Sequence, residues 1–178
     1  MAMMACRNVQ QVIGVEPDFT PETLPLVDQY MRQLPEDSPA EVVELVLSTV
    51  GCYFGEVVRR LLNGRWAISP ADPDRWRVEL INCFFHFRPV GMAGEVYSRG
   101  ADERYDGVFA THPEVWEGLS QALTEAVPMP EDEYYSLAGR VDVLERAVDW
   151  LTGRELASGK PPRTFTAEDY AMALELED

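Results

Sequence analysis

The sequence predicts an α+β fold: a mainly helical single domain with a small three-stranded antiparallel meander packed on a long central helix. Over residues 38–62, apolar side chains cover most of the circumference of a helix. The stretch that follows alternates apolar and polar residues, and helical spacing returns from residue 89 onward. A chain of 178 residues can bury roughly 70% of its unfolded surface in one core, so one domain over 1–178 is expected.

Residues 1–37 are expected to form an N-terminal helical segment. Thr20, Pro21 and Glu22 combine a capping oxygen, a proline at the first helical position and an acid near the positive helix end. Apolar residues then repeat at helical spacing. Residues 9–15 indicate a further helical turn or two before this helix.

Residues 38–100 are expected to hold the long helix and the meander. Ser38 and Glu41 stand in the register of a capping box, which would begin the helix. Asn63-Gly64 supplies the left-handed residues that end a helix.

Gly51 and Gly55 lie four residues apart and therefore share one face of the long helix. Each glycine lowers helix propensity by about 1 kcal/mol relative to alanine. A neighbouring element is therefore expected to pack closely against this face.

Three short strands are predicted after the long helix, at 65–69, 76–80 and 83–87. In the second strand apolar and charged residues alternate, so one face of the meander is apolar and the other is charged. The apolar face needs a cover, and the preceding long helix is expected to supply it.

Residues 101–178 are expected to form an acidic helical portion. An acidic loop over 101–110 precedes a helix that Thr111 would begin, as the first residue of a second capping box. Two prolines end this helix, a longer helix follows over 131–152, and a linker leads to a last helix that begins at Thr166.

Charge is the strongest compositional feature, since 31 Asp and Glu oppose 15 Lys and Arg, for a net charge of −16 at pH 7. The acid is concentrated: residues 101–178 hold 18 acidic and six basic side chains, a net of −12. Such a surface repels phosphate backbones and anionic membranes, so neither nucleic acid nor a membrane is expected as a partner. A basic protein is the predicted partner, and the oligomeric state stays open.

The protein is predicted to be cytoplasmic. Its three cysteines are widely and irregularly spaced, as fits a reducing compartment. No apolar run reaches the ~18 residues of a membrane span, and the first residues contain no apolar segment of the kind found in secretory signals.

Motifs for catalysis, metal binding and cofactor binding identify no site. Cys83 and His86 are the one local pair of thiol and imidazole, and residues three apart on a strand point to opposite faces. The histidines and cysteines lack zinc-ligand spacing, and the glycines lack the spacing of a phosphate or dinucleotide loop. We predict no catalytic residue, no metal ligand and no cofactor, although 31 acids permit carboxylate pairs that sequence cannot identify.

The candidate partner-binding surface joins two acidic clusters to a pair of tyrosines. Aromatic residues are enriched at protein interfaces, although the same residues also pack cores. The candidate residues are Asp102, Glu103, Asp106, Glu131, Asp132, Glu133, Tyr134 and Tyr135.

An alternative site is a pocket between the long helix and the sheet. Glu56 lies three and four residues before two arginines in an otherwise apolar helix. Such charges either form an internal ion pair that fastens the helix to the sheet, or line a pocket whose apolar walls shift their pKa values. The candidate pocket residues are Glu56, Arg60, Trp66 and His86.

The run from Gly55 to Trp66, in which Gly-Glu and Arg-Arg end a helix that enters a Gly-Arg-Trp strand, resembles a signature of small acidic bacterial proteins. These domains are similar to some immunity and accessory proteins of bacterial competition systems. The resemblance spans about residues 38–89 and carries no catalytic residues. It implies a non-enzymatic protein.

These observations leave two functions open. The first is a non-enzymatic acidic module that neutralises or regulates a basic protein, as an immunity protein would. The alternative is a small-molecule-binding or hydrolytic domain that uses the pocket beside Glu56. A smooth acidic face would favour the first function, and a cleft in which the pocket residues converge would favour the second.

Overall fold

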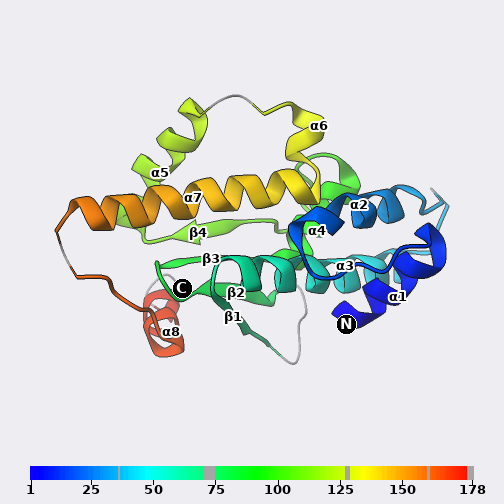
Figure 1. Cartoon of the computed structure of the whole chain (residues 1–178), viewed down its shortest axis with the longest axis horizontal. Helices are drawn as coiled ribbons and strands as arrows, with labels where there is room; N and C mark the ends of the chain where they lie inside the picture. The colour runs from blue at the N-terminus through cyan, green and yellow to red at the C-terminus, as the bar shows by residue number, and fades with distance from the viewer. Residues whose placement is uncertain (36, 70–74, 127–128, 160, 176–178) are drawn as a thin grey trace.

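The computed structural model describes residues 1–35, 37–69, 75–126, 129–159 and 161–175 (Figure 1). Within these ranges the helices are α1 (Ala2–Ile13), α2 (Leu24–Arg32), α3 (Ala40–Leu61), α4 (Pro89–Ser98), α5 (Pro113–Glu125), α6 (Glu131–Tyr134), α7 (Leu137–Ala157) and α8 (Ala167–Glu175), with a 3-10 turn η1 (Pro21–Thr23) before α2. The strands are β1 (Gly64–Ala67), β2 (Arg77–Leu80), β3 (Phe85–Phe87) and β4 (Phe109–Thr111). The predicted α+β, mainly helical single domain is confirmed. No helix in these ranges is both long enough and apolar enough to cross a membrane.

The long helix α3 lies at the centre of the hydrophobic core, where α1, α4, β1 and β2 pack against it. Its two glycines allow the closest of these contacts. A Cβ atom at Gly51 would lie 2.6 Å from the Cα atom of Val90 in α4, and one at Gly55 would overlap the ring of Trp66 in β1. The predicted close packing on this face is confirmed, because only hydrogen fits between the helix and its neighbours.

The N-terminal end of α3 differs from the sequence prediction. The hydroxyl group of Ser38 donates to the carbonyl oxygen of Pro35 at 2.7 Å, and Pro39 takes the N-cap position, so the predicted capping box does not form. At the other end, Asn63 has a φ angle of 57°, the predicted left-handed conformation, whereas Gly64 does not adopt it and is the first residue of β1.

The N-terminal segment is more helical than the sequence indicates. A full helix, α1, replaces the turn or two predicted near residues 9–15, and its buried residues Ala5, Cys6 and Val9 pack into the core. Gly14 ends it in the left-handed conformation.

The sheet has four antiparallel strands in the order β1-β2-β3-β4, so the predicted number of three is wrong. The extra strand, β4, begins inside the predicted loop over 101–110. Thr111 pairs with Phe85 in β3, and its hydroxyl group donates to the carbonyl oxygen of Phe84 at 2.6 Å, so it does not cap α5. Three residues at a sheet edge are too few to show a strand period in the sequence.

The two faces of the sheet are both largely covered. Register places Trp66 opposite Val78 and Val78 opposite Phe87, on the face toward α3, and the predicted cover by the long helix is confirmed. On the other face the carboxylate of Glu79 is only 2% exposed. It forms ion pairs with Arg65 at 3.0 Å and Arg77 at 2.9 Å.

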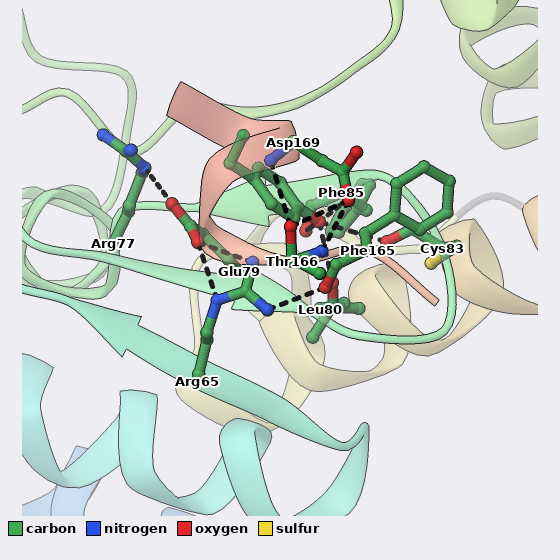
Figure 2. Close-up of polar contacts among 10 residues, drawn as sticks. Arg65, Arg77, Glu79, Leu80, Cys83, Phe85, Phe165, Thr166 and Asp169 are labelled. Carbon is green, nitrogen blue, oxygen red and sulfur yellow. Dashed lines mark hydrogen bonds and ion pairs between the residues drawn. The ribbon is translucent and has the colours of Figure 1, made fainter. Parts of the chain in front are cut away.

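Helix α8 covers this charged face from the far end of the chain (Figure 2). The hydroxyl group of Tyr170 accepts a hydrogen bond from the backbone N–H of Phe85 at 2.8 Å. The same oxygen lies 2.8 to 3.1 Å from the carbonyl oxygens of Leu80, Cys83 and Phe85, so its one proton always has an acceptor. Tyr170 thereby satisfies the buried backbone of the β2–β3 turn.

The start of α8 is the predicted one. Thr166 donates its backbone N–H to the carboxylate of Asp169 at 2.8 Å, and Asp169 donates its own N–H to the Thr166 hydroxyl oxygen at 3.2 Å. Figure 2 shows this reciprocal cap beside Arg65, whose guanidinium donates to the carbonyl oxygen of Phe165 at 2.7 Å.

The helix predicted over 131–152 is two helices, α6 and α7. The hydroxyl oxygen of Ser136 accepts from the backbone N–H of Gly139 at 3.0 Å and caps a new helix. The carboxylate of Asp28 in α2 accepts from the backbone N–H of Leu137 at 3.0 Å, which ties the start of α7 to α2.

Tyr170→Phe is expected to lower the free energy of unfolding by about 1–3 kcal/mol, because it leaves buried backbone groups of the β2–β3 turn without a partner. Urea unfolding measures this change. Tyr97→Phe removes a hydroxyl group from α4 instead and should change stability less. Equal effects of the two substitutions would contradict the role given to Tyr170.

Candidate functional site

A pocket of about 440 Å³ opens between α1, α3 and β1. We call it the aromatic pocket, and its walls include Phe19, Cys52, Glu56, Arg60, Trp66, Ile68 and Trp76. Three of the four predicted pocket residues, Glu56, Arg60 and Trp66, therefore converge on one cavity between the long helix and the sheet.

Glu56 is held in place by three neighbours. Its carboxylate accepts from Arg59 Nε and Nη2 at 2.8 Å each, from Arg60 Nε at 2.7 Å and from Trp66 Nε1 at 3.3 Å. The hydrogen bonds from Arg59, followed by those from Arg60 and Trp66, lower the pKa of Glu56 to about 2 despite partial burial. Glu56 thus forms ion pairs within α3, accepts a hydrogen bond from Trp66 that ties α3 to β1, and is a fixed anion in the pocket wall.

Arg60 and Phe19, which also line the pocket, are held by stacking. The guanidinium of Arg60 lies 4.5 Å from the centre of the Phe19 ring, which stacks on Tyr53 at 4.8 Å. Phe19 has a φ angle of 65°, and its backbone N–H donates to the Tyr53 hydroxyl oxygen at 2.9 Å. A non-glycine residue in the left-handed region is held there by such contacts.

His86 does not join the other predicted pocket residues. It pairs with Glu79 in the sheet, whereas Trp66 pairs with Val78, so His86 and Trp66 lie on opposite faces. His86 is buried against the ring of Tyr170, and burial, with smaller contributions from nearby arginines, lowers its pKa to about 4. His86 is therefore a neutral residue under α8 rather than a pocket residue.

The remaining pocket residues were not predicted. Cys52 lies four residues before Glu56 on α3, so helical spacing could have identified it. Phe19, Ile68 and Trp76 come from segments that only the tertiary fold brings together. Burial raises the pKa of the Cys52 thiol to about 11, so it is protonated at neutral pH. Within the described part of the chain no group of three residues could hold a metal ion.

The predicted partner-binding residues have mixed surroundings. Asp102 forms an ion pair with Arg104 at 2.6 Å, and Asp106 forms one with Arg88. Tyr134 and Tyr135 are half-buried, with ring centres 4.2 and 5.1 Å from the guanidinium carbon of the buried Arg140. The members that lie exposed are Glu103, Asp106, Glu131, Asp132 and Glu133.

A row of acidic residues on α7, with Arg146 beside it, was not predicted. Asp142, Glu145 and Asp149 are spaced three and four residues apart, which puts them on one face of the helix. Partial burial, and then the negative charges of Asp142 and Asp149, raise the pKa of Glu145. We call these three residues the α7 acid row; their helical spacing was visible in the sequence.

A second hollow, which we call the arginine cleft, consists of two adjoining cavities of about 570 and 490 Å³ that share Arg32, Val96 and Arg99 in their walls. The first cavity adds the predicted residues Glu131, Asp132 and Tyr135, and the second adds Asp28, Asp102 and Arg104. The fold thus gathers four predicted partner residues around one cleft, but arginines accompany them and the cleft carries both signs of charge.

Asp28 is the buried ionisable group of this cleft. Asp28 is 4% exposed. Burial raises the pKa of its carboxyl group to about 6, although the hydrogen bond from the Leu137 N–H and the charge of Arg32 act to lower it. The carboxyl group of Asp28, which accepts a hydrogen bond from the start of α7, therefore titrates just below neutral pH.

Comparison with known proteins gave no match to a family model, a curated protein or a solved structure.

Asp28→Asn is expected to alter the pH dependence of stability. An unfolded aspartate has a pKa near ~3.9, so the raised pKa in the fold means that stability from this group is greatest below about pH 4 and falls as pH rises through about 6. The difference is about 3 kcal/mol. The asparagine oxygen can still accept from Leu137, so the variant should lack this fall.

Urea unfolding between about pH 4 and 7.5 measures the difference between the two proteins. Asp37→Asn, at an exposed position, is the control and should retain the wild-type profile. A variant at Asp28 with the wild-type slope would contradict the assignment.

Proposed function

We propose that this protein binds a small, mainly aromatic molecule carrying one anionic group in the aromatic pocket. The observation that carries the proposal is the convergence of Trp66, Trp76 and Phe19 around a cavity of about 440 Å³ beside the Glu56–Arg60 ion pair. Ligand sites typically have volumes of about 300–1,000 Å³, with apolar and aromatic walls and a few placed polar groups.

Arg60 supplies the attraction for an anionic group. Its Nε atom is bound to Glu56, whereas its terminal nitrogens have no hydrogen-bond partner among the described residues. Because Glu56 fixes one edge of the guanidinium and Phe19 supports its plane, the free edge is pre-oriented. A carboxylate, sulfonate or phosphate on an aromatic body could accept from that edge.

The chemistry of the walls supports binding rather than catalysis. Glu56 is a carboxylate at neutral pH and has no proton to give, since its pKa is about 2. The Cys52 thiol is protonated and therefore a weak nucleophile.

The probe for this pocket is 1-anilinonaphthalene-8-sulfonate, which joins an aromatic body to one sulfonate. Saturable binding is expected, with a change in tryptophan emission. Ile68→Asp places a charge at the pocket rim, at a position 59% exposed, and should weaken binding at least ~10-fold because the charge would have to be desolvated.

Two matched controls separate the pocket from other surfaces. Leu156→Asp introduces the same charge at a position 70% exposed on α7 and should bind the probe as the wild type does. Arg59→Gln removes the other partner of Glu56 and should weaken binding less than Arg60→Gln. Equal binding by the two aspartate variants would refute the proposal.

A second candidate function, which we also propose, is the docking of a basic protein on the α7 acid row together with the exposed acids of α6, Glu131, Asp132 and Glu133. The specific observation is that Asp142, Glu145 and Asp149 share one face of α7, where partial burial, and then the charges of Asp142 and Asp149, raise the pKa of Glu145.

Three arginines of the C-terminal part pair with other carboxylates, while Arg146, four residues after Asp142, lies beside the α7 acid row. Arg104 pairs with Asp102, Arg140 pairs with Glu95 at 2.5 Å, and Arg163 pairs with Asp169 at 3.2 Å. Exposed, unpaired acids accelerate association with a basic partner and make its affinity fall with salt.

A lysine-rich oligopeptide tests this surface. The triple variant Asp142→Asn, Glu145→Gln, Asp149→Asn should bind it several-fold more weakly at low salt, and the difference should vanish at high salt. A second triple variant, Glu16→Gln, Glu22→Gln, Glu44→Gln, changes net charge equally at other exposed positions. If both variants lose the same affinity, net charge alone acts and the α7 acid row is not a site.

A further inference from the structure

Arg32 and Arg99 face the same cleft from different helices. Arg32 belongs to the last turn of α2, and Arg99 follows directly after α4. Each lines both cavities of the arginine cleft, as does the apolar side chain of Val96. The two positive groups therefore border the same hollow.

Neither guanidinium has an ion-pair partner among the described residues. Eight other arginines do have such a partner: Arg59, Arg60, Arg65, Arg77, Arg88, Arg104, Arg140 and Arg163. Asp28 lies near enough to Arg32 to be affected by its charge, but the Asp28 carboxylate is buried and accepts from Leu137. In a chain with twice as many acids as bases, two unpaired arginines in one cleft are available for an external anion.

The backbone at Arg99 supports a role for its side chain. Arg99 has a φ angle of 53° and ends α4 in the left-handed region, where glycine is the favoured residue. An arginine there costs stability relative to glycine, and strained residues of this kind concentrate at functional sites.

We infer that the arginine cleft binds a compact anionic group, a carboxylate or a phosphate, between Arg32 and Arg99. Both side chains can donate paired N–H groups to such an anion. Glu131 and Asp132 line one cavity and Asp28 and Asp102 the other, and these carboxyl groups disfavour an extended polyanion, so the ligand is a small molecule with one such group. Val96 and Tyr135 offer apolar surface to the rest of it. This site is independent of the aromatic pocket.

Backbone amide NMR titrations with inorganic phosphate and with acetate test the site, with sodium chloride as the control for ionic strength. Saturable shifts are expected around residues 96–104 and at Tyr135 with one of the anions or both. Saturation by phosphate alone identifies a phosphate ligand, and saturation by acetate alone identifies a carboxylate ligand. The absence of saturation beyond the chloride control with both anions overturns the proposal.

Two substitutions separate a binding role from a structural one. Arg32→Gln is expected to weaken binding of the anion by about ten-fold. Arg99→Gly is expected to weaken it equally while it keeps or raises the melting temperature, because glycine accepts the left-handed conformation without strain. Arg7→Gln and Arg146→Gln, at exposed positions outside the cleft, should leave binding unchanged. Unchanged binding in Arg32→Gln and Arg99→Gly overturns the proposal.

Discussion

The close approach of neighbours to Gly51 and Gly55 on α3 is the constraint on which the rest of the structure depends. Through these two positions the first turn of α4 and the ring of Trp66 reach the helix axis more closely than any side chain would allow. Trp66 then meets Glu56 one residue further along α3, and Glu56 orients Arg60. The aromatic pocket is thus a product of backbone packing, since its polar edge is set by the same contact that joins the sheet to the helix.

Net charge proved a poor guide to local charge in this molecule. Several arginines pair with nearby carboxylates, so Asp102 and Asp106 in the acidic loop are each in an ion pair, whereas none of the ion pairs found among the described residues includes Asp142, Glu145 or Asp149. The arginine cleft gathers arginines and carboxyl groups around one hollow, and Arg32 and Arg99 have no ion-pair partner there among the described residues. The local charge that a binding partner encounters depends on ion pairs between groups a few ångströms apart, because Coulomb interactions are strong at that distance.

The parts of the fold and site that were predictable from sequence are those set by local spacing. The glycine pair on α3, the cap of α8 and the meeting of Glu56 with Arg60 all follow from helical periodicity. The prediction that His86 lines the pocket was wrong because strand register, which no local pattern reveals, puts His86 on the face opposite Trp66. Arg32 and Arg99 have no sequence signal at all, because separate helices bring them together.

The docking of Tyr170 bears on how the protein is made. Its hydroxyl group serves backbone atoms 85 to 90 positions earlier in the chain, in a turn that leaves the ribosome long before α8. Until α8 has been synthesised, it cannot cover Glu79 and His86. Contacts of such long range slow folding and prolong exposure of unfinished surfaces. The charged face of the hairpin therefore gains its cover only after more than 80 further residues have been synthesised.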